Sequence, residues 1–344
     1  MSHQVTIQPS QHTFEVGPEQ NILQAALAAG YVIPYGCRNG ACGTCKGKIV
    51  TGKVDYGRHQ EATLTPEEKA SGLALFCQAK PLSDVVIECR EINAIKDIQI
   101  RTLPCRVQKI ERPASDVVIL YLKLPNNERL QFLAGQYIDI LLKDNKRRSF
   151  SMANPPHDDE FVQLHIRGLP GGQFSDFVFN KLKERDILRF NGPLGTFFLR
   201  EDPKPIIFVA SGTGFAPIKA IIEDVFHKDI NRSMTLYWGG RREQDLYLSN
   251  LAKQWQQQHS DFTYVPVVSD ALPEDRWQGR TGFVHKAVME DFQDLSGYQV
   301  YACGAPVVVE AAHRDFTSQR GLSKDDFFSD SFTFAADPET TKLR

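Results

Sequence analysis

The sequence predicts a multidomain protein that combines an α+β domain, an antiparallel β-barrel and a parallel α/β domain. Three observations predict this. Three cysteines crowd into a glycine-rich loop near the N-terminus, short β-type segments separated by turn residues fill the middle, and strands alternate with helices from Pro205 onward. A chain of 344 residues is long enough for about two to three domains, each with its own core.

Composition describes an ordinary globular chain, with 42% hydrophobic and 24% charged residues. The formal net charge of -2 provides no basic field that would attract nucleic acid or anionic lipid. The first residues lack the pattern of a signal peptide, and no apolar run reaches the roughly 18 residues of a membrane span. We therefore expect a cytoplasmic protein without a nucleic-acid partner or a membrane span. There, clustered thiols more often bind metal or do redox chemistry than form disulfides.

The first candidate site is the loop Tyr35–Gly47, which holds Cys37, Cys42 and Cys45. Their spacing, C-x4-C-x2-C, is that of a plant-type [2Fe-2S] cluster. Zinc sites usually show paired C-x2-C units or histidines, and no histidine lies within ten residues of this loop. The spacing favours an iron–sulfur cluster over a zinc or purely structural site, and glycines in the loop let the backbone fold tightly around it.

A fourth thiolate is needed, and two cysteines could supply it. Cys89 ends a predicted strand, in which Val85, Ile87 and Cys89 share one face by period-two alternation. That position is typical of a small buried core residue. Cys77, which follows Cys45 along the chain, is therefore the predicted ligand.

The segments around this loop predict a small domain. Residues 5–16 have the pattern of a hairpin, residues 21–30 that of a short helix with Asn21 as N-cap, and residues 47–56 that of a second strand pair. Together with the cysteine motif, this segment resembles plant-type ferredoxins. The resemblance implies a β-grasp [2Fe-2S] ferredoxin domain over residues 1–93.

The second domain is expected over residues 103–201, where short β-type runs predict an antiparallel barrel interrupted by one helix at residues 171–182. Three motifs stand out in it. On a strand, Arg148 and Phe150 of "RRSFSMANPP" share one face. The Arg148 cation can then contact a phosphate of a ligand while the Phe150 ring lies on the ligand's ring system. The segment "GGQFS", residues 171–175, opens the helix and can bind an anion, and "GPLGTF", residues 192–197, forms a tight turn.

The third domain is expected over residues 203–337. Residues 205–226 predict a buried strand, a glycine-rich turn and a helix, and further strands and helices follow in alternation. Ligands of such parallel sheets bind beyond the carboxyl ends of the strands. Three segments fall there: 212–214, 239–241 and 303–304.

The order of these motifs resembles the ferredoxin–NADP reductase superfamily, in particular members with an N-terminal ferredoxin domain. Within it, "KRRSFSMANPP", "YWGGRREQDLY" and "FFSDSFTFAAD" look most similar to CDP-6-deoxy-Δ3,4-glucoseen reductases. Reductase components of aromatic-ring and hydrocarbon oxygenases share the architecture. The resemblance implies FAD in the barrel and NADH or NADPH on the parallel sheet. Phe150 departs from the tyrosine common in the flavin motif, so its ring can stack without the phenol's hydrogen bond.

The resemblance also assigns site residues. The barrel's candidate cofactor-binding residues are Arg148, Ser149, Phe150, Ser151, Arg167, Gly172, Gln173 and Ser175. Those of the third domain are Gly212, Thr213, Gly214, Pro217, Gly239, Arg241, Cys303, Gly304 and Pro306. Ser151 and Cys303 are expected to line the hydride-transfer site, although Cys303 could instead be a buried strand-end thiol. Phe332, or else Phe328, is expected to cover the flavin ring, with simple core packing as the alternative.

These parts imply a reductase that passes electrons from NAD(P)H through FAD and the [2Fe-2S] cluster to a partner protein, either a dehydrase or an oxygenase component. A general flavin reductase and a redox-sensing binding protein are the alternatives, although a sensor would not need a complete nucleotide domain. NADH is the expected donor. Arg241 and Arg242 could clamp a 2′-phosphate, or Arg242 could belong to a solvated charged turn with Glu243 and Asp245.

Overall fold

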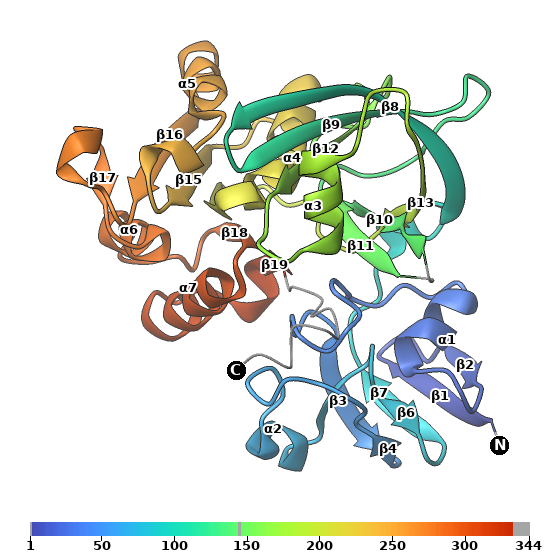
Figure 1. Cartoon of the computed structure of the whole chain (residues 1–344). Coiled ribbons are helices and arrows are strands. Elements are labelled where there is room, and N and C mark those ends of the chain that lie inside the picture. The colour runs from blue at the N-terminus through green and yellow to red at the C-terminus, as the bar shows by residue number, and fades with distance from the viewer. Residues whose placement is uncertain (1, 144–145, 333–344) are drawn as a thin grey trace. The chain divides into compact units, whose positions relative to one another are not determined.

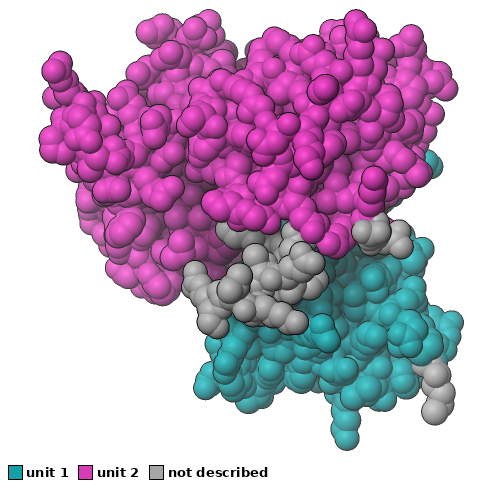
Figure 2. All heavy atoms as spheres, in the orientation of Figure 1, with its two compact units in different colours: residues 1–99 teal, residues 100–344 magenta. Residues whose placement is uncertain are grey.

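The structure is a computed structural model that describes residues 2–143 and 146–332. The chain divides into two compact units, Met1–Gln99 and Ile100–Arg344, which are coloured separately in Figure 2. The division falls between the first two domains expected from the sequence. The predicted end of the third domain, at residue 337, lies outside the described residues.

The first unit is built on a mixed five-stranded sheet with the order β2-β1-β7-β3-β5 (Figure 1). Its strands are β1 (His3–Gln8), β2 (Thr13–Val16), β3 (Lys46–Thr51), β5 (Leu73–Leu75) and β7 (Val85–Glu88). A small second ladder joins β4 (Val54–Asp55) to β6 (Lys80–Pro81), and two helices, α1 (Ile22–Ala28) and α2 (Pro66–Ala70), complete the unit. The helix α1 and one face of each of strands β1 and β7 contribute to one apolar core.

The hairpin and the helix predicted in this unit are confirmed. Strands β1 and β2 pair antiparallel. Asn21 caps α1 by accepting the Gln24 N–H at 2.8 Å, and the Gln24 side chain accepts the Asn21 N–H in return. The strand pair predicted over residues 47–56 is wrong in its pairing: β3 and β4 both form, but not with each other. Strand β3 already has β5 on one side and β7 on the other, so β4 pairs with β6 instead.

The second unit begins with the predicted antiparallel barrel. Its strands are β8 (Arg101–Ala114), β9 (Val117–Lys123), β10 (Tyr137–Leu141), β11 (Arg147–Ser151), β12 (Val162–Arg167) and β13 (Ile187–Leu194). They follow the order β11-β10-β13-β8-β9-β12, and a bridge between Met152 and Leu164 joins the two ends of this order. The helix α3 (Gln173–Asn180) packs Phe174 and Val178 into the barrel core.

The predicted parallel sheet completes the second unit (Figure 1). Its strands, in the order β17-β16-β15-β14-β18-β19, are β14 (Ile206–Ser211), β15 (Met234–Gly240), β16 (Phe262–Val268), β17 (Arg280–Thr281), β18 (Gln299–Gly304) and β19 (Phe327–Ser331). Its main helices are α4 (Phe215–His227), α5 (Ser249–Gln258), α6 (Val284–Asp291) and α7 (Pro306–Gln319). Alternate strand residues form two apolar clusters, one with α4 and α5 and the other with α6 and α7, so helices cover both faces.

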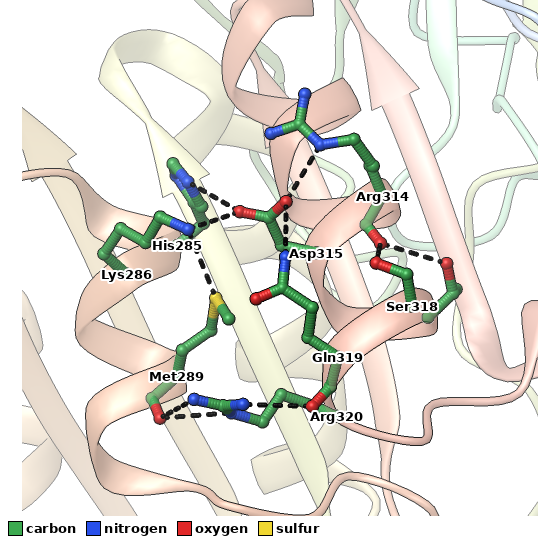
Figure 3. Close-up of polar contacts among 9 residues, drawn as sticks. His285, Lys286, Met289, Arg314, Asp315, Ser318, Gln319 and Arg320 are labelled. Atoms are coloured by element: carbon green, nitrogen blue, oxygen red, sulfur yellow. Dashed lines mark hydrogen bonds and ion pairs between the residues drawn. The ribbon is translucent and has the colours of Figure 1, made fainter.

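One buried carboxylate ties α6 to α7 (Figure 3). Asp315 is 1% exposed, and its oxygens accept from Lys286 Nζ at 2.6 Å and from Arg314 Nε at 2.9 Å. His285 Nε2 lies 3.5 Å from the same carboxylate. The contact joins charged groups across the two helices that cover one face of the sheet.

Candidate cofactor sites

The four predicted cluster ligands lie together in the first unit as two pairs of thiols. The Cys37 N–H donates to Cys42 Sγ at 3.4 Å, and the thiols of these two residues contact each other. Cys45 and Cys77 form the second pair, and both are buried. Asn21, the cap of α1, donates from Nδ2 to the Cys77 carbonyl at 2.8 Å and so fixes the second pair to the helix.

In each pair, contact between the thiols lowers the pKa of one and raises the pKa of the other. Cys42 lowers the pKa of Cys37 to about 5, and Cys45 lowers the pKa of Cys77, while the pKa of Cys42 and of Cys45 is raised by its partner thiol. Two neighbouring pairs of thiols fit a two-iron cluster held by four cysteine thiolates.

Cys89 lies apart from this group. It follows the end of β7 and packs, half-buried, against the core of the unit. Burial raises the pKa of its thiol to about 12, with a smaller contribution from Glu91 and none from the other cysteines. These surroundings are those of a structural thiol.

The loop around the first three cysteines is shaped by close backbone contacts. Gly40 has a φ of +80°, and a Cβ there would lie 2.6 Å from the Arg58 carbonyl oxygen. The buried Thr63 hydroxyl donates to the Ala41 carbonyl at 3.1 Å. Residues 57–63 therefore hold the cysteine loop in place from outside it.

In the second unit, the two predicted flavin motifs meet. Phe150 on β11 and Phe174 on α3 have ring centroids 5.4 Å apart, so "RRSFSMANPP" and "GGQFS" form one site. No side chain caps the first turn of α3, which leaves its N–H groups and positive dipole end for an anion. Together with the positive charge of Arg148 on β11, this end of the barrel fits the phosphates and ring of a flavin nucleotide.

Two serines of these motifs bond within the protein. The Ser149 hydroxyl donates to the buried Asp139 at 2.7 Å. Ser175 donates to the carbonyls of Leu169 and Gly172 at 3.2 and 3.0 Å. Ser175 thus shapes the turn that enters α3, and Gln173 lies at the helix start, where its side chain accepts from Lys146 at 3.1 Å.

The two predicted nucleotide motifs pack backbone against backbone at the carboxyl ends of β14 and β18. A Cβ on Gly214 would lie 2.2 Å from the Cys303 carbonyl oxygen. Gly304 has a φ of +133°, and a Cβ there would lie 2.4 Å from the Ser211 carbonyl oxygen. Only glycine allows this approach. It places the starts of α4 and α7, neither of which has a side-chain cap, at one edge of the sheet.

These uncapped helices point to a ligand. The turn Gly212–Gly214, which leads into α4, and the first turn of α7 lie at the same edge of the sheet, where chain order reverses between β14 and β18. That edge fits the pyrophosphate of a pyridine nucleotide.

Arg167 joins the barrel to this edge. It ends β12, and its Nη1 would lie 2.9 Å from a Cβ on Gly212. Its guanidinium lies 3.1 Å from Asp116 and 3.5 Å from Asp245. Asp245 in turn accepts the Arg241 and Arg242 N–H groups, at 2.8 and 3.0 Å, and so shapes the loop that follows Gly239.

The two residues expected at the hydride-transfer site are brought together by an aspartate that sequence reasoning missed. The Ser151 hydroxyl donates to Asp330 Oδ2 at 3.3 Å, and both residues are buried. Asp330 pairs with Cys303 in the sheet register of β18 and β19. Burial, and after it the charge of Asp330, raises the pKa of the Cys303 thiol well above its usual range, so the thiol is neutral.

The two aromatic candidates of the tail make different contacts. Phe328 stacks on the buried Tyr301 with centroids 4.8 Å apart, so it belongs to the core. Phe332 follows β19, and its N–H donates to the Gly304 carbonyl at 2.8 Å. Its side chain is partly buried and, like that of Phe328, packs against the apolar core of the parallel sheet.

A cysteine-rich β-sheet unit, followed by an antiparallel barrel and a parallel α/β domain with these motifs, defines a flavin- and pyridine-nucleotide-dependent reductase with a ferredoxin domain. Known families match in the same order: the 2Fe-2S iron-sulfur cluster binding domain over residues 5–82, the oxidoreductase FAD-binding domain over 104–199 and the oxidoreductase NAD-binding domain over 208–314. The chain belongs to the iron–sulfur flavoprotein reductases of the ferredoxin–NADP reductase superfamily.

Individual relatives cover almost the whole chain. The CDP-6-deoxy-L-threo-D-glycero-4-hexulose-3-dehydrase reductase of Yersinia pseudotuberculosis is 42% identical over 96% of this chain and 99% of its own length. Terephthalate 1,2-dioxygenase reductase component 2 of Comamonas is 36% identical over 96% of this chain and 98% of its own. The crystal structure of an Amycolatopsis cytochrome P450 reductase, 34% identical, superposes with a TM-score of 0.78 and covers 97% of this chain and 100% of its own.

The chain is therefore an NAD(P)H-dependent oxidoreductase with domains for FAD and a [2Fe-2S] cluster. When bound, a flavin accepts a hydride from a nicotinamide and releases its electrons to one-electron carriers such as a cluster. No helix in the described part of the chain is long and apolar enough to cross a membrane.

Proposed function

We propose that this chain takes electrons from NADH and delivers them, through FAD and a cluster held by Cys37, Cys42, Cys45 and Cys77, to a separate acceptor protein in the cytoplasm. The observation that carries the proposal is the presence of three sites in one chain: two thiol pairs, a flavin-type barrel end and an uncapped nucleotide edge. A redox sensor would need the first of these alone.

Residues of the second unit position the reacting groups in this proposal. Asp330 holds the Ser151 hydroxyl at 3.3 Å, so the hydroxyl hydrogen is fixed toward the carboxylate and the oxygen lone pairs are free to face a bound ring. The neutral Cys303 thiol adds no charge at that point. Water is limited there because Ser151, Cys303 and Asp330 are each at most 8% exposed.

The acceptor that fits best is a sugar dehydrase. The Yersinia relative, 42% identical over nearly its full length, is by name the reductase of a CDP-6-deoxy-hexulose-3-dehydrase. The second candidate is the oxygenase component of a ring-hydroxylating system, because reductases of terephthalate dioxygenase and phenol monooxygenase are 36% and 35% identical.

Reconstitution tests the choice of acceptor. The purified chain, with NADH, is combined in turn with a CDP-6-deoxy-hexulose-3-dehydrase and with a terephthalate dioxygenase oxygenase component, each with its substrate. We expect product formation with the dehydrase and little with the oxygenase. Product with the oxygenase alone would favour the second candidate. NADH oxidation that reduces neither protein, but does reduce free flavin, would favour a general flavin reductase.

A further inference from the structure

The loop that follows β15 lies at the position that, in doubly wound sheets, contacts the adenosine ribose. In doubly wound sheets, an acidic residue near the end of the second strand hydrogen-bonds a ribose 2′-hydroxyl, whereas an arginine there accommodates a 2′-phosphate. β15 lies next to β14, which carries the glycine motif, and the residues after β15 include two arginines, Arg241 and Arg242. On sequence alone, this pair would suit NADPH.

The structure shows that one of the two arginines is already occupied. Arg242 Nη1 lies 3.4 and 3.5 Å from the two carboxylate oxygens of Asp275. Asp275 comes from the next loop, in the short 3-10 turn Pro273–Asp275 after β16. Both side chains are mostly covered, with 33% and 21% of their surfaces exposed. The other arginine, Arg241, is exposed.

The carboxylate is fixed in this position. Asp275 Oδ2 accepts the Leu272 N–H at 2.9 Å within its own turn. Two backbone hydrogen bonds join the loop after β16 to the loop after β15. The Ser269 N–H donates to the Gly240 carbonyl at 2.9 Å, and the Asp270 N–H donates to the Arg241 carbonyl at 2.8 Å. These bonds hold the starts of the two loops together, and the Leu272 N–H holds the Asp275 carboxylate within its turn.

We propose that Asp275 determines nucleotide selectivity: it engages the guanidinium of Arg242, which would otherwise bind a 2′-phosphate, and places a negative charge where that phosphate would enter. The chain is thereby selective for NADH. This inference rests on the proposed function, in which the nucleotide binds at this edge of the sheet.

Binding of two nucleotide fragments tests the proposal without turnover. Calorimetry on the full, cofactor-loaded chain compares 5′-AMP with 2′,5′-ADP, which differ only in the 2′-phosphate. In Asp275→Asn the amide oxygen can still accept the Leu272 N–H, but the charge is gone. We expect this variant to bind 2′,5′-ADP at least about tenfold more tightly than wild type, because a freed arginine makes charge-assisted bonds to phosphate. Its affinity for 5′-AMP should change less than about twofold. The kcat/KM ratio of NADPH to NADH should rise in parallel.

Further variants distinguish the proposed role of Asp275 in selectivity from the effect of removing any nearby charge and from a failure to fold. Glu274→Gln removes an exposed carboxylate from the same turn and should leave both affinities unchanged. The double variant Asp275→Asn with Arg242→Gln should lose the gain, since Arg242 provides it. Asp275→Ser serves as a second neutral replacement if the asparagine variant does not fold.

An unchanged 2′,5′-ADP affinity in folded Asp275→Asn or Asp275→Ser would overturn the inference, as would an equal gain in Glu274→Gln or a gain that survives the loss of Arg242. A wild-type chain that binds neither 5′-AMP nor NADH would overturn the proposed function and the inference with it.

Discussion

At the scale of single residues, the cluster depends on which cysteine completes the set. Cys77 contacts Cys45 and is fixed by Asn21, whereas Cys89 has burial and Glu91 as its only influences on pKa. We expect Cys77→Ser to abolish the visible absorbance of a [2Fe-2S] cluster and Cys89→Ser to retain it. Absorption spectra of both purified variants, scaled to iron content, make the comparison. The reverse pattern would show that Cys89 is the fourth ligand.

A second prediction concerns the aspartate that holds Ser151. Replacing Asp330 by Asn removes the charged acceptor of the Ser151 hydroxyl from a buried site. We expect flavin reduction by NADH in stopped flow to slow by at least about tenfold, with NADH binding little changed.

The matched control for Asp330→Asn is Asp326→Asn. Asp326 is also a buried aspartate near β19, but it pairs with Lys204 at 2.7 Å, not with Ser151. Equal slowing in both variants would mean that the effect comes from a general disturbance of β19 and not from the Ser151 contact.

Single residues could be predicted from the sequence where a residue type has a specific chemical use, as cysteine has in binding iron. The cysteine spacing and the strand pattern of residues 85–89 favoured Cys77 over Cys89 as the fourth ligand, and the structure brings Cys77 into contact with Cys45. Asp330 was missed because a lone aspartate in the aromatic stretch "FFSDSF" gives no periodic signal, and only the pairing of β19 with β18 places it beside Cys303. The sequence signal that could have identified Asp330 was a charged residue among residues otherwise suited to a core.

At the scale of elements, Asp315 links α6 to α7 (Figure 3). Asp315→Asn leaves Lys286 and Arg314 without their buried carboxylate, and we expect a loss of about 1–3 kcal/mol in the free energy of unfolding at neutral pH. Chemical denaturation of the full chain measures it. Glu310→Gln, an exposed carboxylate on the same helix, should cost little.

The same contact predicts a pH dependence. Lys286, as the largest cause, and Arg314 hold the pKa of Asp315 below its ordinary 3.8. The folded pKa is thus below the unfolded one, so the stability from this carboxylate is complete above about pH 4 and is lost as the pH falls through the folded pKa. The difference between wild type and Asp315→Asn should therefore shrink below about pH 4, and a difference that stays constant there would contradict the assignment.

The tail is the other element with a testable role. Phe332 follows β19 beside Gly304, and Phe328 packs on Tyr301. If Phe332 competes with the nicotinamide, Phe332→Ala should lower the KM for NADH about severalfold, whereas Phe328→Ala should lower the melting temperature instead, as large-to-small core changes do. Steady-state kinetics and thermal melts of both variants distinguish the two roles, and an unchanged KM in Phe332→Ala would reject the gate. Deleting residues 327–344 is a poorer test, because it removes β19 from the sheet.

Element prediction failed where partners are distant in sequence. Strands β3 and β4 were expected to pair because they are adjacent, but their partner residues lie between 25 and 40 positions downstream, and the pattern of a strand does not encode its neighbour. Strand β19 was not foreseen either, because the charged residues before it and its short length resemble a solvated tail. The helices and long strands, whose apolar periods are strong, agree with expectation.

At the scale of the whole molecule, each apolar core among the described residues draws its members from one unit. The cluster with Val5 and Ile87 lies in residues 1–99, and the other three lie in residues 100–344. A unit with its own cores is expected to fold alone. We therefore expect that the barrel and the parallel sheet can be produced without the ferredoxin unit, because the candidate flavin and nucleotide residues all lie in residues 100–344.

This separation gives the most direct test of the central claim, that electrons leave through the cluster. Residues 100–344, produced alone and loaded with FAD, are compared with the full chain for NADH-dependent reduction of ferricyanide and of cytochrome c, per bound flavin, with superoxide dismutase present. We predict that the shorter chain reduces ferricyanide, a small acceptor that can reach the flavin, at the full chain's rate and loses most cytochrome c reduction. Cytochrome c reduction at the full-length rate would contradict the claim, because the cluster would then not be the required exit.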